Sequence, residues 1–134
     1  MTSKVSKSID LDAAADKVWG KIGDFNSLAD WHPAVANSEL QENDQVRKLT
    51  LGDGAVIMER KKGGGAMSYS YSIESGPLPV SNYVSEISVA ASNAGCTVTW
   101  SSEFDPVGPA ADAEGAIAGV YEAGLNSLKE MFGS

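Results

Sequence analysis

The sequence predicts an α+β protein in which an antiparallel β-sheet is covered by one long C-terminal helix. Apolar and polar residues alternate through most of residues 35–104, which indicates strands. Short segments that contain Gly or Asn separate these stretches, and such loops favour antiparallel hairpins. Residues 110–132 show helical spacing of apolar residues instead. Because a sheet with one apolar face needs a cover, we expect this helix to lie across the sheet.

One strand and two short helices are predicted before residue 35. Residues 4–9 alternate, which predicts a strand. Asp12 is placed to cap the helix that follows, and Gly23 is a plausible end for it. The apolar stripe of this helix consists of Ala15, Val18, Trp19 and Ile22. Residues 26–31 form a second helix, which Pro33 ends because proline disfavours helical geometry in the residue before it.

Six further strands, joined by tight turns, complete a sheet of seven. The strands are predicted at 35–42, 45–51, 55–62, 66–74, 82–91 and 96–104. The turns are predicted at 43–44, 52–54, 63–65, 75–79 and 93–94. The order is therefore a strand, two short helices, six antiparallel strands and one long helix.

Turn length fixes which side chains share the face beneath the helix, because it sets the register of each hairpin. A three-residue loop at 52–54 places Arg47 opposite Glu59. A three-residue loop at 63–65 would place Glu59 opposite Tyr69. The inner face then carries Leu49, Leu51, Ile57, Met67, Tyr69, Tyr71, Ile73, Tyr83, Ile87, Val89, Val98, Trp100 and Phe104. This face is rich in aromatic residues with polar atoms, whereas the helix above it is rich in Gly and Ala. The small residues either leave room for a ligand or allow close helix–sheet packing.

Composition excludes several classes of protein. The chain has 134 residues, which suggests one domain, and 43% hydrophobic residues, which suits a globular core. A net charge of −8 disfavours nucleic acid and anionic membranes as partners. Cys96 is the only cysteine and His32 the only histidine, so we expect no disulfide, no metal and no cofactor. No apolar run approaches a membrane span and the N-terminus lacks a secretory signal, so we expect a cytoplasmic protein.

In the order of its elements the chain resembles the START/polyketide cyclase (SRPBCC, helix-grip) superfamily, and in local sequence its bacterial polyketide cyclase/dehydrase branch. The matching segments are residues 14–35, 46–60, 69–83, 97–106 and 121–132. The resemblance implies a single START-like domain over 1–134, in which a seven-stranded antiparallel sheet grips the C-terminal helix. It also implies an internal cavity for a hydrophobic ligand. Members bind lipids, sterols, polyketides or plant hormones, and a minority catalyse cyclisation or dehydration, so the fold alone does not settle activity.

We therefore expect a protein, monomeric or homodimeric, that encloses a small hydrophobic, ring-containing molecule between sheet and helix. The expected ligand-binding residues are Trp31, Arg47, Ile57, Tyr69, Tyr71, Leu78, Tyr83, Trp100, Val120 and Gly124. The alternative is a cofactor-independent cyclase or dehydratase-like enzyme. In that case His32, Glu59 or Tyr69 would transfer a proton in the cavity.

Three features of the sequence each allow two interpretations. His32 is either a general acid/base at the mouth of the cavity or a partly exposed loop residue bonded to the backbone. Arg47 and Glu59 form an ion pair in either interpretation. It either faces inward and orients a ligand, or it lies at the rim of the sheet or has a purely structural role. The double-proline segment 76–79 is either a lid over the cavity or a stiff connector.

Overall fold

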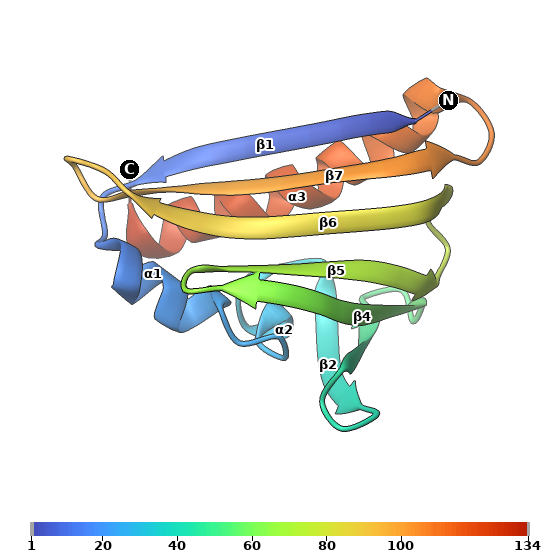
Figure 1. Ribbon diagram of the computed structural model, residues 1–134, viewed down its shortest axis with the longest axis horizontal. Coiled ribbons are helices and arrows are strands. Elements are labelled where there is room, and N and C mark those ends of the chain that lie inside the picture. The colour runs from blue at the N-terminus through green and yellow to red at the C-terminus, as the bar shows by residue number, and fades with distance from the viewer. Residues whose placement is uncertain (1, 134) are drawn as a thin grey trace.

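A computed structural model describes residues 2–133, which form one seven-stranded antiparallel sheet and three helices (Figure 1). The strands are β1 (Ser3–Leu11), β2 (Val35–Gln41), β3 (Val46–Leu51), β4 (Val56–Gly65), β5 (Ser68–Ser75), β6 (Val80–Ala91) and β7 (Cys96–Pro106). The helices are α1 (Ala15–Ile22), α2 (Leu28–Trp31) and α3 (Ala110–Phe132). The strand order is β1-β7-β6-β5-β4-β3-β2, so the first strand joins the last one at the far edge of the meander. The predicted fold class is confirmed.

The long helix α3 runs along the sheet on its concave side, behind β1, β7 and β6 in the view of Figure 1. One face of the helix is buried, as the helical spacing of apolar residues predicts; it carries Ala113, Ile117, Tyr121, Gly124 and Leu128. The end of α3 returns to the beginning of α1. There, the backbone N–H of Asp12 donates to the carbonyl oxygen of Gly133 at 3.0 Å. This hydrogen bond holds the C-terminal end of the helix against the segment between β1 and α1.

The register of two hairpins is as the turn lengths predict. Leu51 N–H donates to Ala55 O at 2.8 Å across the 52–54 loop, and Arg47 lies opposite Glu59. On the last hairpin Ile87 lies opposite Trp100. The two members of each pair share a face of the sheet, since antiparallel partners lie on the same side.

The triple glycine does not form a loop, and the predicted pairing of Glu59 with Tyr69 is wrong. Residues 63–65 continue β4, and the chain turns at residues 66–67 instead. A bulge between Lys61 and Gly63 shifts the register, so Glu59 pairs with Ile73 and Gly64 with Tyr69. Glycine supplies the same backbone N–H and C=O groups to a ladder as any other residue. Moreover, a Cβ at Gly64 would lie 2.8 Å from Ser68 O, so this close approach of two strands requires glycine.

The first helices also begin later than the sequence predicts. The residue that caps α1 is Ala14, without any side-chain hydrogen bond, and Asp12 lies two residues too early to reach the first free amides. Gly23 ends α1 as predicted, with its N–H bonded to Trp19 O. Pro33 follows α2, and the residue before it, His32, is extended with φ −99° and ψ 117°.

Candidate functional site

A cavity of about 80 Å³ lies between the concave face of the sheet and α3. Its lining is mostly aliphatic and aromatic, with polar atoms only at a few positions. The lining residues are Leu28, His32, Ala34, Val35, Leu49, Leu51, Ile57, Glu59, Tyr71, Ile73, Leu78, Tyr83, Trp100, Ile117 and Val120. Ala34 is exposed, and Leu51, Ile73, Leu78 and Val120 are half-buried. These residues therefore border the mouth, where the end of β3, the 76–79 loop and α3 meet.

His32 is buried at 2% exposure and is held by two backbone groups. Its Nε2 lies 2.7 Å from the carbonyl oxygen of Val120 in α3, and its Nδ1 lies 3.2 Å from the N–H of Ala34. A carbonyl only accepts and an amide only donates, so the ring is neutral, with its proton on Nε2. Burial lowers the pKa of His32, against the bond to Val120, and Arg47 lowers it further. Both ring nitrogens form hydrogen bonds to backbone groups, and the bond to Val120 links the end of α2 to α3. The interpretation as a backbone-bonded residue holds, but the residue is buried and not partly exposed.

Gly124 explains how His32 reaches the helix backbone. A Cβ at this position would lie 2.8 Å from His32 Cδ2, 2.9 Å from Trp100 Cζ3 and 3.0 Å from Trp31 Cζ3. Three rings therefore pack directly against the backbone of α3 at Gly124. Here the small residue allows close packing and leaves no room for a ligand. Trp31 is 2% exposed and packs against Trp100 with ring centroids 5.5 Å apart, outside the lining of the cavity.

Arg47 and Glu59 form a buried ion pair, so the interpretation as a rim bridge is wrong. The side chain of Arg47 is fully buried, and that of Glu59 is 7% exposed. Arg47 Nε donates to Glu59 Oε1 at 2.8 Å. Nη2 lies 2.7 Å from the same oxygen but at an angle too bent for a hydrogen bond, so this second contact is electrostatic. The pair lies inside because two adjacent strands place both residues on the concave face.

The third nitrogen of the guanidinium, Nη1, has two hydrogen-bond partners. Nη1 donates to the carbonyl oxygen of Phe25 at 2.9 Å and to the hydroxyl of Tyr69 at 3.1 Å. The Cζ atom lies 4.3 Å from the ring centre of Phe25 and 4.8 Å from that of Tyr71, within cation–π range. These contacts keep Arg47 cationic within the core. They also hold the segment after α1 against the sheet.

Glu59 presents a carboxylate to the cavity. It lines the cavity, and no described residue among 2–133 bonds to its second oxygen, Oε2. Burial raises the pKa of Glu59, while the charge of Arg47 and its hydrogen bond oppose this effect. A carboxyl group of this kind can accept or hold a proton near a bound molecule.

The aromatic wall of the cavity is joined by hydrogen bonds. Trp100 Nε1 donates to the Tyr71 hydroxyl at 3.0 Å. The Tyr83 hydroxyl bonds to that of Tyr121, which also bonds to Ser85 Oγ at 2.9 Å. Burial raises the pKa of both Tyr71 and Tyr83 well above the ordinary value, so both are neutral phenols. Trp100 and Tyr121 stack with ring centroids 4.5 Å apart. Hydrogen bonds and stacking therefore hold these rings in place.

The structure brings most of the predicted residues together. His32, Ile57, Glu59, Tyr71, Leu78, Tyr83, Trp100 and Val120 line the cavity. Trp31, Arg47 and Gly124 lie behind that lining, and Tyr69 faces a separate surface cleft. Sequence reasoning missed Tyr121 as a polar group of the interior and Lys61 as a half-buried group of the surface cleft. Lys61 follows Ile57 and Glu59 in strict alternation, which is a signal for the same face.

No group of three His, Cys, Asp or Glu side chains within residues 2–133 is arranged to hold a metal ion. No helix within this range has the length and apolarity to cross a membrane.

The curved sheet that encloses a cavity against α3 defines a helix-grip protein. The family described as "Polyketide cyclase / dehydrase and lipid transport" matches residues 2–133, and the chain belongs to this family. A search of curated proteins gives no match.

Several solved structures are similar over almost the whole chain. A putative uncharacterized protein from Bacillus thuringiensis is 36% identical, with a TM-score of 0.93 and coverage of 97% of this chain and 98% of that one. The protein XoxI from Bacillus cereus is 34% identical, with a TM-score of 0.90 and coverage of 97% and 95%. The Zhui aromatase/cyclase from Streptomyces sp. R1128 is 21% identical, with a TM-score of 0.77 and coverage of 98% and 93%. This last likeness shows the fold alone.

Proposed function

We propose that the protein binds a small hydrophobic, ring-containing molecule in the cavity between sheet and α3. The observation that carries this proposal is the lining, in which aliphatic residues surround a few fixed polar groups. The side chains of Tyr71, Tyr83 and Trp100 offer ring faces to a planar ligand, and Glu59 offers one polar partner. Membership of a family that includes lipid transport supports a hydrophobic ligand.

The size of the cavity requires that it widen on binding. Its volume is about 80 Å³, whereas small-molecule sites usually measure about 300–1,000 Å³. The aromatic wall is fixed by hydrogen bonds, so the widening must occur at the half-buried mouth. Leu78 lines the mouth from the 76–79 segment, where Pro77 and Pro79 restrict the backbone. The segment therefore opens as a stiff flap, with Leu78 as its inner surface.

Native mass spectrometry of the freshly purified protein tests this proposal. Val120→Phe fills the cavity from α3, and Val84→Phe makes the same change on the outer face, where Val84 is 49% exposed. We expect a co-purified ligand on the wild type and on the Val84→Phe protein, and little on the Val120→Phe protein. Naphthalene added to ligand-free protein should shift the NMR signal of the Trp100 indole N–H. Equal ligand retention by both variants, or no shift of Trp100, would overturn the proposal.

A cyclase or dehydratase-like activity is a second candidate, favoured by the free oxygen of Glu59. In this case Glu59 Oε2 is the group that transfers a proton, because both nitrogens of His32 are occupied by backbone groups. Glu59→Gln keeps the shape of the side chain but removes the titratable group. We expect the ligand extracted from that variant to be heavier by the mass of one water than the ligand from the wild type, because the variant cannot eliminate water from it. The same ligand mass in both proteins contradicts an activity based on Glu59.

A further inference from the structure

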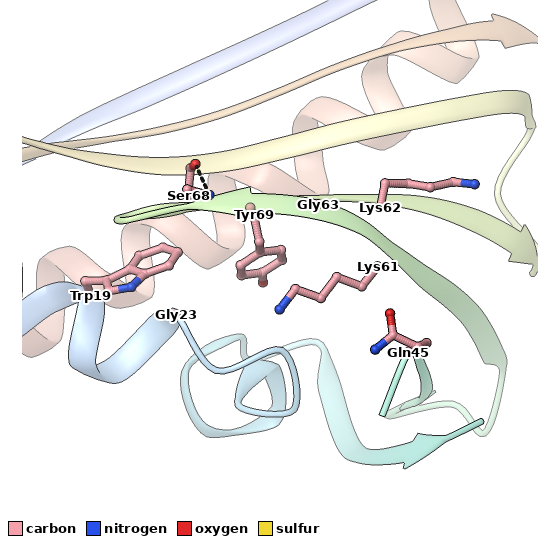
Figure 2. A pocket seen from close by; sticks show the side chains of 10 residues that line it. Trp19, Gly23, Gln45, Lys61, Lys62, Gly63, Ser68 and Tyr69 are labelled. Atoms are coloured by element: carbon pink, nitrogen blue, oxygen red, sulfur yellow. Dashed lines mark hydrogen bonds between the residues drawn. The ribbon is translucent and has the colours of Figure 1, made fainter. Parts of the chain in front are cut away.

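A second hollow, of about 470 Å³, lies on the surface at the end of the sheet where β4 and β5 turn (Figure 2). It shares no lining residue with the cavity beneath α3. Its lining residues are Trp19, Gly23, Gln45, Lys61, Lys62, Gly63, Gly64, Gly65, Ser68 and Tyr69. We refer to these ten residues as the surface cleft. It lies between the end of α1, the beginning of β3 and the last part of β4.

Lys61 gives the surface cleft a positive charge directed inward. The bulge after Lys61 leaves this residue opposite Tyr71, so its side chain leaves the sheet on the concave side. In Figure 2 the amine of Lys61 points into the cleft toward Tyr69, whereas Lys62 points away. Within residues 2–133, Lys61 forms no ion pair. The chain as a whole has a net charge of −8 and repels anions. An unpaired lysine in a hollow attracts them locally, at that hollow.

Two aromatic rings and two glycines form the rest of the recognition surface. The rings of Trp19 and Tyr69 lie 6.1 Å apart at an angle of 48°. The indole of Trp19 lies directly over Gly23, where a Cβ would be 2.5 Å from Trp19 Cε2. Gly64 shares the inner face with Tyr69 and adds no side chain beside it. Trp19 is half-buried and Tyr69 is 2% exposed, so the accessible ring surface beside the ammonium group of Lys61 comes from Trp19.

The Arg47–Glu59 pair separates the surface cleft from the cavity. Tyr69 lines the cleft and its hydroxyl accepts a hydrogen bond from Arg47, while Glu59 lines the cavity. Because Arg47 is fully buried between them, a ligand in one hollow does not extend into the other.

We propose that the surface cleft is a second binding site, which takes a small aromatic carboxylate. The carboxylate pairs with Lys61, and the aromatic ring packs against Trp19. A single negative charge fits best, because Lys61 is the one amine seen to point inward and the C-terminal end of α1 borders the cleft at Gly23. The partial negative charge of a helix C-terminus disfavours a dianion such as phosphate. The proposal does not depend on the function proposed for the cavity.

Titration with 2-naphthoate, followed by ¹H–¹⁵N NMR, tests the site because the indole N–H signals report the two hollows separately. Trp19 lines the cleft, and Trp100 lines the cavity. We expect a saturable shift of the Trp19 indole and of the amides of residues 63–65, with the Trp100 indole unchanged. Lys61→Gln should weaken binding about fivefold or more, as loss of an ion pair does. Lys62→Gln removes the same charge from a side chain that points away, and should change affinity less than about twofold.

The outcomes distinguish this proposal from the one for the cavity. Val120→Phe should leave the affinity for 2-naphthoate at Trp19 unchanged, even where it abolishes ligand retention in the cavity. Equal weakening by Lys61→Gln and Lys62→Gln would show diffuse attraction to surface charge and would overturn the site. A shift confined to Trp100, or no saturable shift at millimolar 2-naphthoate, would also overturn it.

Discussion

Arg47 and Glu59 meet in the core through one carboxylate oxygen, Oε1, which lies 2.8 Å from Nε and 2.7 Å from Nη2 of the guanidinium. Glu59 also lines the cavity, and Nη1 of the same guanidinium donates to the hydroxyl of Tyr69. The ion pair therefore contacts a polar side chain of each hollow: Glu59 belongs to the lining of the cavity, and Tyr69 to that of the surface cleft.

The first prediction concerns the stability of this ion pair. Glu59→Gln leaves a buried guanidinium without a counter-charge, so we expect the free energy of unfolding to fall by about 3–5 kcal/mol. The double variant Arg47→Met/Glu59→Leu removes both charges and should recover much of the loss, because no charge then remains buried. Urea denaturation measures all three proteins. A loss below about 1 kcal/mol for Glu59→Gln would match a surface bridge and contradict the buried geometry.

The second prediction concerns pH, and it follows from the buried ring of His32. Burial lowers the pKa of His32 below the ordinary value of 6.5. The unfolded chain then binds more protons than the folded one, so the free energy of unfolding falls as the pH drops from about 6.5 toward the lower folded pKa. Urea denaturation at a series of pH values measures this slope.

The control for this prediction is His32→Gln, which removes the only histidine. Its unfolding free energy should lack the loss below about pH 6.5. Glu59 acts in the opposite direction, since burial raises the pKa of Glu59 above 4.5 and the folded state then binds more protons. A wild-type slope that persists in His32→Gln would contradict the assignment.

The third prediction compares two glycines of α3. Gly124→Ala places a Cβ within 3.0 Å of three rings, so we expect a loss of about 1–3 kcal/mol in unfolding free energy through overpacking. Nothing lies within 4 Å of a Cβ at Gly119, so Gly119→Ala should stabilise by roughly 0.5–1 kcal/mol through helix propensity. Thermal unfolding of the two variants should therefore shift in opposite directions. A gain in stability for both would show that the rings do not pack on Gly124.

The fourth prediction compares two buried tryptophans. Trp100 Nε1 donates to Tyr71, whereas Trp31 Nε1 has no hydrogen-bond partner within residues 2–133. Changing either residue to Phe removes the same ring volume, but only Trp100→Phe leaves the Tyr71 hydroxyl without its partner. We expect Trp100→Phe to lose about 1 kcal/mol more unfolding free energy than Trp31→Phe. Equal losses, measured by urea denaturation, would show that the hydrogen bond contributes nothing.

Local patterns predicted the inner face of the sheet well, but they did not predict the register between β4 and β5. The loop at 52–54 fixed the pairing of Arg47 with Glu59, because a short loop between alternating strands allows one register. When only the local sequence is considered, three consecutive glycines are typical of a turn. It forms strand instead, because a bulge at Lys62 and the close approach of Ser68 become visible only when both strands are placed.

The sequence by itself determined the order of elements, the face that each strand turns inward and the family, because these follow from periodicity and from short-range turn chemistry. Only the tertiary structure decided what the inner residues do. Whether Arg47 lies at a rim or in the core depends on which elements cover β3, and the role of His32 depends on a carbonyl 88 residues away in α3. Contacts of this length arise from packing, which no local pattern encodes.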